Sequence, residues 1–196
     1  MDTQIETDVE RTAGRGSLDC LVRRRGFCCI GLDNPKTNIN VGSVLRAAGV
    51  YEAQMVVIAG HRYGKAPTDT MRHHRHLPLL QVENLHDAIP FDCVPVAVEL
   101  IPNAIPLPEY KHPERAFYVF GAEDATLGHR VLSWCRDVVY IPMDGCMNLA
   151  ATVNVVLYDR MCKARATPND PSSATRPTRA CACNRDAMAG FAAAHG

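Results

Sequence analysis

The chain has 196 residues, of which 47% are hydrophobic and 21% are charged. These values are ordinary for a soluble globular protein, and they exclude disorder of the whole chain. Because 21 basic residues balance 21 acidic ones, the formal net charge is zero, so any surface for a negatively charged partner must be local.

The two ends of the chain frame one expected domain at 26–164. Residues 1–25 carry charges throughout and lack an apolar core, which predicts a flexible N-terminal arm and no signal peptide. Residues 165–196 begin with a stretch rich in Pro, Ser and Thr, which predicts a flexible C-terminal tail. No apolar run approaches the length of a membrane span, so we expect a cytoplasmic protein with no membrane contact.

Between these ends, short apolar runs alternate with stretches of helical periodicity. Strands are predicted at 27–32, 55–59, 77–82, 94–100, 116–120 and 138–143, and helices at 41–51, 84–89, 127–135 and 149–162. Strands that are apolar on both faces and alternate with helices are typical of a buried parallel sheet. The sequence therefore predicts an α/β fold with a mainly parallel sheet and helices on both faces.

The expected helix at 149–162 is apolar on nearly every side, since only Thr152 and Asn154 are strongly polar between Leu149 and Tyr158. Such a helix must be buried on more than one face. One face can pack on the sheet of a small domain, which leaves another apolar face to cover. We expect a homodimer that packs through this helix; the alternative is burial under the tails of the same chain.

The nine cysteines do not form a pattern typical of metal ligands. Cys28 and Cys29 lie inside an apolar run, where cysteine behaves as a small hydrophobic residue. Cys181 and Cys183 are one residue apart, which is not the spacing of zinc ligands. We therefore expect reduced thiols and no metal.

Three segments place glycine, asparagine and a charged residue after an expected strand, where open α/β sheets bind their ligands. In the first segment, 34–46, Asn40 can cap a helix and Gly42 leaves room for a phosphate at the helix N-terminus. Arg46 lies one turn after Gly42 and can bind a phosphate with two hydrogen bonds. The plainer interpretation is an ordinary capped helix with a surface arginine.

The second and third segments have the same construction. In 120–128, Gly121 ends a strand, Glu123 follows it, and Gly128 precedes a helix. Glu123 can also be a plain acidic residue that stabilises a helix N-terminus. In 141–150, Asn148 can cap the apolar helix. The apolar residues of this segment can wall an adenine or simply pack in the core; they are Ile141, Met143, Met147 and Leu149.

Taken in order, the three segments resemble the signature motifs of the SpoU/TrmH family of the SPOUT superfamily. The matching residues are Asn40-Val-Gly-Ser-Val-Leu-Arg46, then Phe120-Gly-Ala-Glu123 with Gly128, then Ile141-Pro-Met-Asp-Gly with Asn148. The resemblance covers residues 27–163. It implies a C-terminal trefoil knot, a homodimer around the last helix, and S-adenosylmethionine bound largely by backbone groups. The cofactor residues that it implies are Glu99, Leu100, Ile101, Gly121, Ile141, Met143, Met147 and Leu149.

The resemblance also implies an RNA methyltransferase, with ribose 2′-O-methylation of tRNA or rRNA as the expected reaction. Arg46 would hold the phosphate beside the target nucleotide, and Asn40, Glu123 and Asn148 would complete the catalytic group. Arginine stays protonated in proteins, so the identity of the proton acceptor is left open. Two local basic patches are expected to bind RNA, although each can also be solvated surface charge: Arg23, Arg24 and Arg25, and Arg62, Lys65, Arg72 and Arg75.

Two other functions remain open at this point. One is methylation of a base by an enzyme of the same superfamily. The other is a catalytically silent RNA-binding protein of the same fold. The second is conceivable because Cys146 and Ala150 stand where the family pattern usually has serine.

Overall fold

The computed structural model describes residues 26–62 and 76–165. The described residues up to Ala164 belong to one unit of the chain, Leu21–Ala164. The expected N-terminal arm and nearly all of the expected C-terminal tail lie outside the described residues. So do six of the basic residues expected to bind RNA, namely Arg23, Arg24, Arg25, Lys65, Arg72 and Arg75.

Seven strands form one sheet in the order β3-β2-β1-β6-β4-β7-β5. Their bounds are β1 Phe27–Asp33, β2 Met55–Ala59, β3 Leu79–Val82, β4 Val94–Val98, β5 Ile105–Pro106, β6 Arg115–Phe120 and β7 Asp137–Tyr140. All pairings among these strands are parallel, and in the central register Cys29 lies opposite Met55 on one side and Phe117 on the other. The carboxyl ends of the strands therefore meet at one edge of the sheet.

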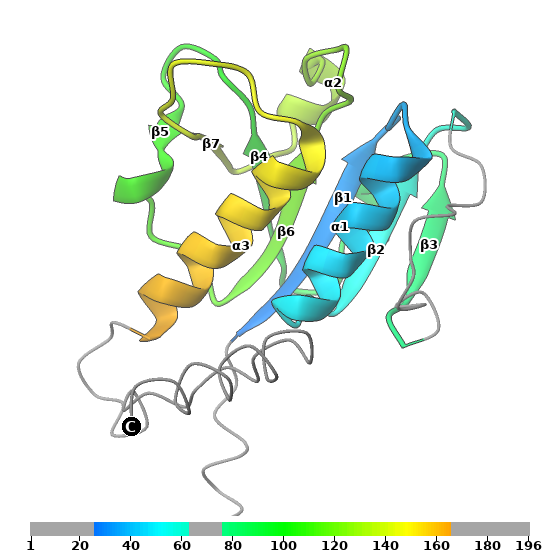
Figure 1. Ribbon diagram of the computed structural model, residues 1–196, viewed down its shortest axis with the longest axis horizontal. Coiled ribbons are helices and arrows are strands. Elements are labelled where there is room, and N and C mark those ends of the chain that lie inside the picture. The colour runs from blue at the N-terminus through cyan, green and yellow to red at the C-terminus, as the bar shows by residue number, and fades with distance from the viewer. Residues whose placement is uncertain (1–25, 63–75, 166–196) are drawn as a thin grey trace, which may run out of the picture. The chain divides into compact units, whose positions relative to one another are not determined.

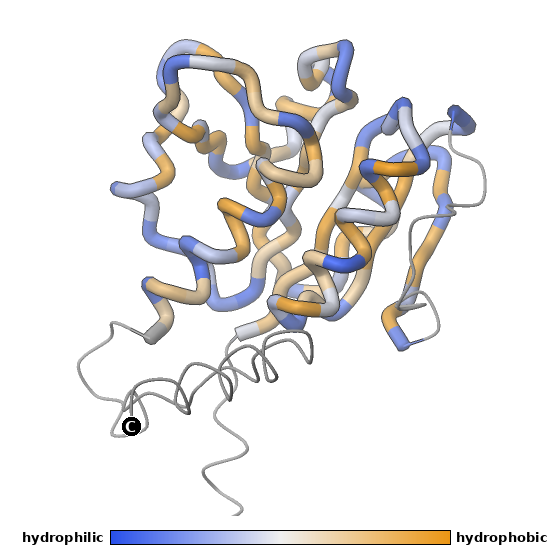
Figure 2. Tube along the Cα trace, viewed as in Figure 1, coloured by the Kyte–Doolittle hydropathy of each residue, from blue (hydrophilic) through white to orange (hydrophobic). Residues whose placement is uncertain are grey.

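Helices cover both faces of this sheet, as the sequence predicts. The helices α1 (Asn38–Val50) and α3 (Leu149–Arg165) lie on one face, where Val44, Val153 and Leu157 join a core with Tyr118. Hydrophilic and hydrophobic residues alternate along both helices (Figure 2). The short helices η3 (Leu85–Ala88) and α2 (His129–Leu132) contribute Leu85 and Val131 to a second core on the opposite face. Figure 1 labels α1, α2 and α3 but not η3.

The order of the strands differs from their order along the chain. Strand β6 lies between β1 and β4, and β7 lies between β4 and β5, so strands of the second half of the chain are joined by crossover connections. A third short helix, η4 (Leu107–Glu109), follows β5 directly. The expected trefoil knot stays a prediction, because strand order alone does not define a knot.

Element boundaries differ from the expected ones where local hydrogen bonding decides them. The expected helix at 127–135 is helical only over His129–Leu132, and the amides of Trp134 and Cys135 bond three residues back in tighter turns. The strand expected at 138–143 ends at Tyr140, the last residue that pairs with β5. The two-residue strand β5 shows no alternation in so short a run, which is why the sequence does not predict it.

A buried arginine joins α3 to the start of β6. Arg160, only 7% exposed, donates to the carbonyl of Pro113 at 2.6 Å, the carbonyl of Glu114 at 2.7 Å and the Tyr118 hydroxyl at 3.1 Å. Gly26 lies against this group with φ +70°, and an added Cβ would come within 2.6 Å of the guanidinium. The close approach explains why a side chain is excluded at Gly26.

We expect Arg160→Met to lower the free energy of unfolding by about 3 kcal/mol, because the aliphatic stem is kept while buried acceptors lose their donor. Chemical denaturation monitored by circular dichroism measures this change. The matched control is Arg136→Met, since Arg136 is 60% exposed and pairs with Asp137 at the surface. A surface pair contributes about 0–1 kcal/mol, so equal losses in the two variants would contradict the expectation.

Two features are missing from the part of the chain that the structure describes. None of its helices combines the length and apolar character needed to cross a bilayer. In the same residues, no three His, Cys, Asp or Glu side chains gather into a cluster able to hold a metal ion.

Candidate active site

The loops that carry the three motif segments leave the carboxyl edge of the sheet, and so does the loop after β4, which carries Glu99, Leu100 and Ile101. Residues 34–37 follow β1, 121–128 follow β6, 99–104 follow β4, and 141–148 follow β7. These four strands are neighbours in the order β1-β6-β4-β7, so segments that are distant in the sequence emerge side by side. The placement agrees with the rule that open α/β sheets bind ligands at this edge.

Glu123 joins the loop after β6 to the start of α1. Its Oε2 accepts the backbone N–H of Lys36 at 2.7 Å. Its Oε1 accepts the side-chain amide of Asn40 at 2.6 Å, the Thr37 hydroxyl at 2.9 Å and the Thr37 backbone N–H at 3.3 Å. One carboxylate therefore holds four donors that come from a single short stretch of chain.

These contacts favour the ionised form of Glu123. Partial burial raises the pKa of its carboxyl, but the hydrogen bonds from Lys36, Asn40 and Thr37 outweigh burial and lower the pKa to about 2. The carboxylate stays charged throughout the neutral range. Glu123 is thus suited to fixing the two loops, and it is poorly suited to accepting a proton during a reaction.

Asp124 makes a second, more exposed link between the same loops. It accepts two hydrogen bonds from the Arg62 guanidinium, at 2.9 and 3.2 Å, and its carboxylate lies 3.3 Å from the Lys36 ammonium. The hydrogen bond from Arg62 is the main cause that lowers the pKa of Asp124 to about 2. Arg62, which the sequence assigns to an RNA-binding patch, is therefore partly neutralised by a partner in its own chain.

The cap of α1 differs from the expected one. Thr37 is the N-cap, and its hydroxyl accepts the Asn40 backbone N–H at 3.4 Å. The prediction that Asn40 caps this helix is wrong, because its side chain turns to Glu123 while Thr37 supplies the capping oxygen. Asn40 still belongs to the site, as a donor to Glu123.

The other two expected catalytic residues lie on two different helices. Arg46 lies further along α1 with an exposed side chain. Asn148 caps α3 as expected, since its Oδ1 accepts the Ala151 backbone N–H at 2.7 Å. Asn40 thus donates a hydrogen bond directly to Glu123, whereas the side-chain oxygen of Asn148 accepts one from its own helix.

Glu99 connects the loops expected to hold the cofactor. Its carboxylate accepts the backbone N–H of Leu127 at 2.8 Å and of Leu100 at 3.0 Å, and its own N–H donates to the Val139 carbonyl at 2.9 Å. Gly121 lies against the turn that follows it, where an added Cβ would meet the Ala125 carbonyl at 3.1 Å. The carboxylate of Glu99 therefore ties the loop after β4 to the loop after β6, and its backbone N–H extends the pairing with strand β7.

The remaining expected cofactor residues divide by burial. Leu100 and Met143 are 76% and 46% exposed, which is unusual for large apolar side chains on neighbouring loops. Ile101, Ile141 and Met147 are half-buried. Leu149 is 6% exposed and packs in the core, so only its backbone can contribute to a binding surface. Exposed apolar side chains beside backbone groups fit a ligand that has an apolar ring and a polar tail.

Sequence reasoning missed Lys36, Thr37 and Asp124. Thr37 had a readable signal, because threonine at the start of a helical run is a common N-cap. The signal competed with that of Asn40, which is an equally good capping residue. Lys36 and Asp124 carry no local signal, because their contacts join segments that are distant in the sequence.

The chain matches the model of a known protein family. The model of the SpoU rRNA Methylase family matches residues 28–158, which covers the whole sheet and most of α3. No curated protein matches the chain in sequence.

Solved structures share the fold at low sequence identity. The SpoU methyltransferase AviRb from Streptomyces viridochromogenes has a TM-score of 0.64 and 23% identity, covers 75% of this chain, and is matched over 63% of its own length. AviRb has also been solved in complex with AdoMet. The A. aeolicus TrmH/SpoU tRNA modifying enzyme has a TM-score of 0.64 and 17% identity, with 74% of this chain and 79% of that chain covered.

A structure described as an RNA 2′-O ribose methyltransferase has a TM-score of 0.60 and 23% identity, with 71% of this chain and 57% of that chain covered. The chain thus spans less than two thirds of AviRb and of this protein. At these identities the likeness establishes a common fold.

Proposed function

The chain belongs to the SpoU rRNA methylase family, and from this membership we propose that it transfers a methyl group from S-adenosylmethionine to a ribose 2′-hydroxyl of tRNA or rRNA. The observation that carries the proposal is the set of contacts at Glu123, which ties the loop after β6 to the start of the helix that bears Arg46. Solved structures of the same fold include an RNA 2′-O ribose methyltransferase and a methyltransferase bound to AdoMet, in keeping with this reaction.

When bound, the cofactor supplies a methyl group that its sulfonium already activates. The residues of this chain then have to hold that group and the ribose oxygen in line, and such positioning can account for several kcal/mol of a reaction barrier, roughly 7–11 in favourable cases. The loops at Glu99 and Gly121, which the Glu99 carboxylate joins, would hold the cofactor, and Leu100 and Met143 would cover its apolar ring. Asn148 keeps the start of α3 in place beside them.

Arg46 would bind the phosphate next to the target ribose, because a guanidinium can form two parallel hydrogen bonds with phosphate oxygens. Asn40 and Glu123 would fix the N-terminal turn of α1, so that Arg46 is presented at a constant position. Glu123 is already ionised and already accepts four hydrogen bonds, which argues against it as the acceptor of the hydroxyl proton. A phosphate oxygen or a water molecule remains available for that role.

The test is incubation of the purified protein with tritium-methyl-labelled S-adenosylmethionine and fractionated total RNA, followed by nucleoside mapping. We expect label in one 2′-O-methylated nucleoside of the tRNA or rRNA fraction. Label in a base would overturn the ribose assignment. Cofactor binding without transfer to any fraction would favour a silent RNA-binding protein, for which the cysteine at Cys146 and the alanine at Ala150 leave room.

We further propose a homodimer that packs through α3. One stripe of the helix stays partly open to solvent, with Tyr158 55% exposed. The residues of this stripe are Ala151, Val155, Tyr158 and Cys162, which recur at helical spacing. A mainly apolar stripe of this length is typical of a helix that packs against a second helix.

Replacing Tyr158 by Asp is expected to convert a dimer into a monomer, because an unpaired charge in an apolar interface costs several kcal/mol, roughly 3–5. Analytical ultracentrifugation should give twice the chain mass of 21.5 kDa for the unmodified protein and that mass for the variant. Phe91→Asp is the control, since Phe91 is 93% exposed and lies away from α3 in the loop before β4. A monomeric unmodified protein would refute the dimer.

We also propose that the protein acts in the cytoplasm. The support is chemical: the six cysteines in the described residues are free, among them Cys28, Cys29 and Cys93 in the core. Free thiols are the usual state of cysteine in a reducing compartment. Fractionation of cells that express the tagged protein would test this placement.

A further inference from the structure

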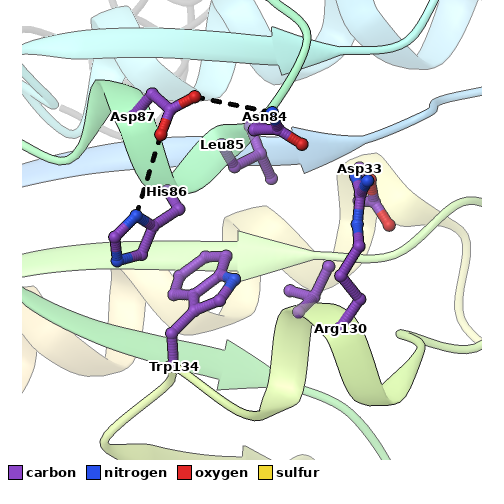
Figure 3. Close-up of a pocket in the computed structure, with 8 residues that line it drawn as sticks. Asp33, Asn84, Leu85, His86, Asp87, Arg130 and Trp134 are labelled. Carbon is purple, nitrogen blue, oxygen red and sulfur yellow. Dashed lines mark hydrogen bonds and ion pairs between the residues drawn. The ribbon is translucent and has the colours of Figure 1, made fainter.

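A cavity of about 240 Å³ opens on the sheet face opposite α1 and α3, between η3 and α2 (Figure 3). Its apolar floor is formed by Leu85 and Val131, which are buried. The volume lies below the range of roughly 300–1,000 Å³ that is typical of pockets for drug-sized ligands, so the cavity suits a single ring system.

An aromatic wall stands on one side of the cavity. The indole of Trp134 meets the imidazole of His86 edge to face, with ring centroids 5.5 Å apart and an angle of 66° between the planes. Figure 3 shows the indole directed into the space between η3 and α2. An aromatic face beside a ring-sized cavity is the usual platform on which proteins stack a nucleic-acid base.

The carboxyl group of Asp33 lies on the other side of the cavity from Trp134. Asp33 is half-buried at the end of β1, and within the described residues its carboxyl accepts no hydrogen bond. Burial raises its pKa, and the positive charge of Arg130 opposes that rise. Figure 3 shows the Arg130 side chain extending toward Asp33. By contrast, the carboxylate of Asp87 lies 3.5 Å from the Asn84 amide nitrogen and 3.8 Å from His86 Nδ1.

The cavity adjoins the loops of the candidate active site. Asp33 directly precedes the segment whose Lys36 backbone binds Glu123, and Arg130 lies in the helix that follows the Glu123 loop. The loops after β1 and β6 therefore meet at Glu123, and elements that adjoin the same two loops also line the cavity. The cavity therefore lies next to the loops at which the RNA of the proposed function would bind.

We propose that this cavity binds one unpaired guanine of the RNA substrate, outside the methylated nucleotide, with the base stacked on Trp134 and its N–H groups donated to Asp33. Guanine fits best because its N1–H and its 2-amino group are neighbouring donors. The two oxygens of one carboxylate can accept both of these hydrogen bonds. Arg130 supplies a positive charge for the adjoining phosphate. The proposal rests on the proposed function for its RNA substrate. It adds one base that the protein recognises outside the methylated nucleotide.

The test uses the intrinsic fluorescence of Trp134, because the sequence has a single tryptophan. We expect GMP to change this fluorescence with a dissociation constant about 10-fold below that of UMP, because a good pair of hydrogen bonds to a base discriminates by at least about that factor. Asp33→Asn should remove the preference, because an amide cannot accept both donors. Equal affinity for GMP and UMP, or no fluorescence change with either, overturns the proposal.

The matched control is Asp92→Asn, which makes the same chemical change outside the residues that line the cavity. Asp92 has φ +62°, a conformation that asparagine tolerates well, so this variant is expected to fold and keep the preference for GMP. Loss of the preference in Asp92→Asn as well would overturn the assignment to Asp33. The titration of the unmodified protein tests the cavity even if Asp33→Asn fails to fold.

Failure of this proposal and failure of the proposed function give different results. If the unmodified protein labels RNA but shows no preference for GMP, the cavity is not a base site while the methyltransferase stands. If it binds GMP at Trp134 but labels no RNA, the methyltransferase fails and the base site is supported on its own.

Discussion

Replacing Glu123 by alanine is expected to lower the rate of methyl transfer by about 100-fold or more, a loss of the size seen when groups that position a reaction are removed. The carboxylate accepts four hydrogen bonds from Lys36, Thr37 and Asn40, so its removal releases the loop after β6 from the start of α1. Arg46 and the cofactor loops would then lose their fixed relation. Steady-state assays with labelled cofactor and RNA measure the loss.

The control variant is Asp124→Ala, which removes the neighbouring, more exposed carboxylate that pairs with Arg62 and Lys36. Surface pairs contribute little, so this variant is expected to keep at least about a third of the activity. If Asp124→Ala loses as much activity as Glu123→Ala, general disturbance of the loop explains both, and Glu123 has no special positioning role.

The lowered pKa of Glu123 also predicts how stability depends on pH. A carboxyl whose pKa falls on folding stabilises the protein above its unfolded value, and the contribution is lost as the pH falls through the folded value. For Glu123 these values are 4.5 and about 2. The difference in unfolding free energy between the unmodified protein and Glu123→Gln should therefore be constant above about pH 4.5 and shrink toward pH 2. Denaturation at several pH values measures it, and a constant difference throughout would contradict the contacts at Glu123.

Replacing Arg46 by alanine is expected to abolish methyl transfer, with a loss of about 100-fold or more, and to leave cofactor binding nearly unchanged. The side chain is exposed on α1, whereas the residues expected to bind the cofactor lie on the loops after β4, β6 and β7. The loss is expected because a displacement of about 1 Å between reacting groups can cost about 100-fold in rate, and Arg46 would hold the phosphate that fixes the target ribose. Isothermal titration with S-adenosylmethionine and a tritium-methyl assay with RNA separate the two effects.

Arg46→Lys keeps the charge and serves as the matched variant. Lysine cannot form the two parallel hydrogen bonds of a guanidinium, so we expect only partial recovery, mainly through RNA affinity. Binding of RNA by the unmodified protein should weaken as salt rises, because phosphate contacts release counterions. Loss of cofactor binding together with activity in Arg46→Ala would count against a role in holding phosphate.

The contacts at Glu123 suggest why the motif segments need each other. Asn40 belongs to the first segment and Glu123 to the second, and their 2.6 Å hydrogen bond joins the two. Glu99 joins the loop after β4 to the second segment through Leu127. The motifs are therefore parts of one connected group of loops, and a change in one segment is expected to disturb the others.

Much of the fold follows from local pattern. Strands β1, β2 and β6 are short apolar runs, and the sequence predicts each of them to within one residue, because a strand buried on both faces has to be apolar throughout. The alternation of strands with helices is also visible along the sequence, and it predicts a parallel sheet because parallel neighbours need a crossover connection, which is usually a helix. Helix α3 and its cap at Asn148 are also local, since a capping side chain contacts only its own first turn.

Other features depend on residues that are far apart in the sequence. The order β1-β6-β4-β7-β5 brings loops from both halves of the chain together, and no local pattern carries that order. Thr37 caps α1 in place of Asn40 because Glu123 engages the Asn40 side chain from another loop. The Asp124–Arg62 pair and the cavity at Trp134 arise in the same way.

Periodicity and capping thus determine which segments become strands and helices, because those preferences act within a few residues along the chain. The contacts that build the site act between loops that meet only after the sheet has formed. The tertiary structure alone therefore decided which groups pair with Glu123 and Asp124.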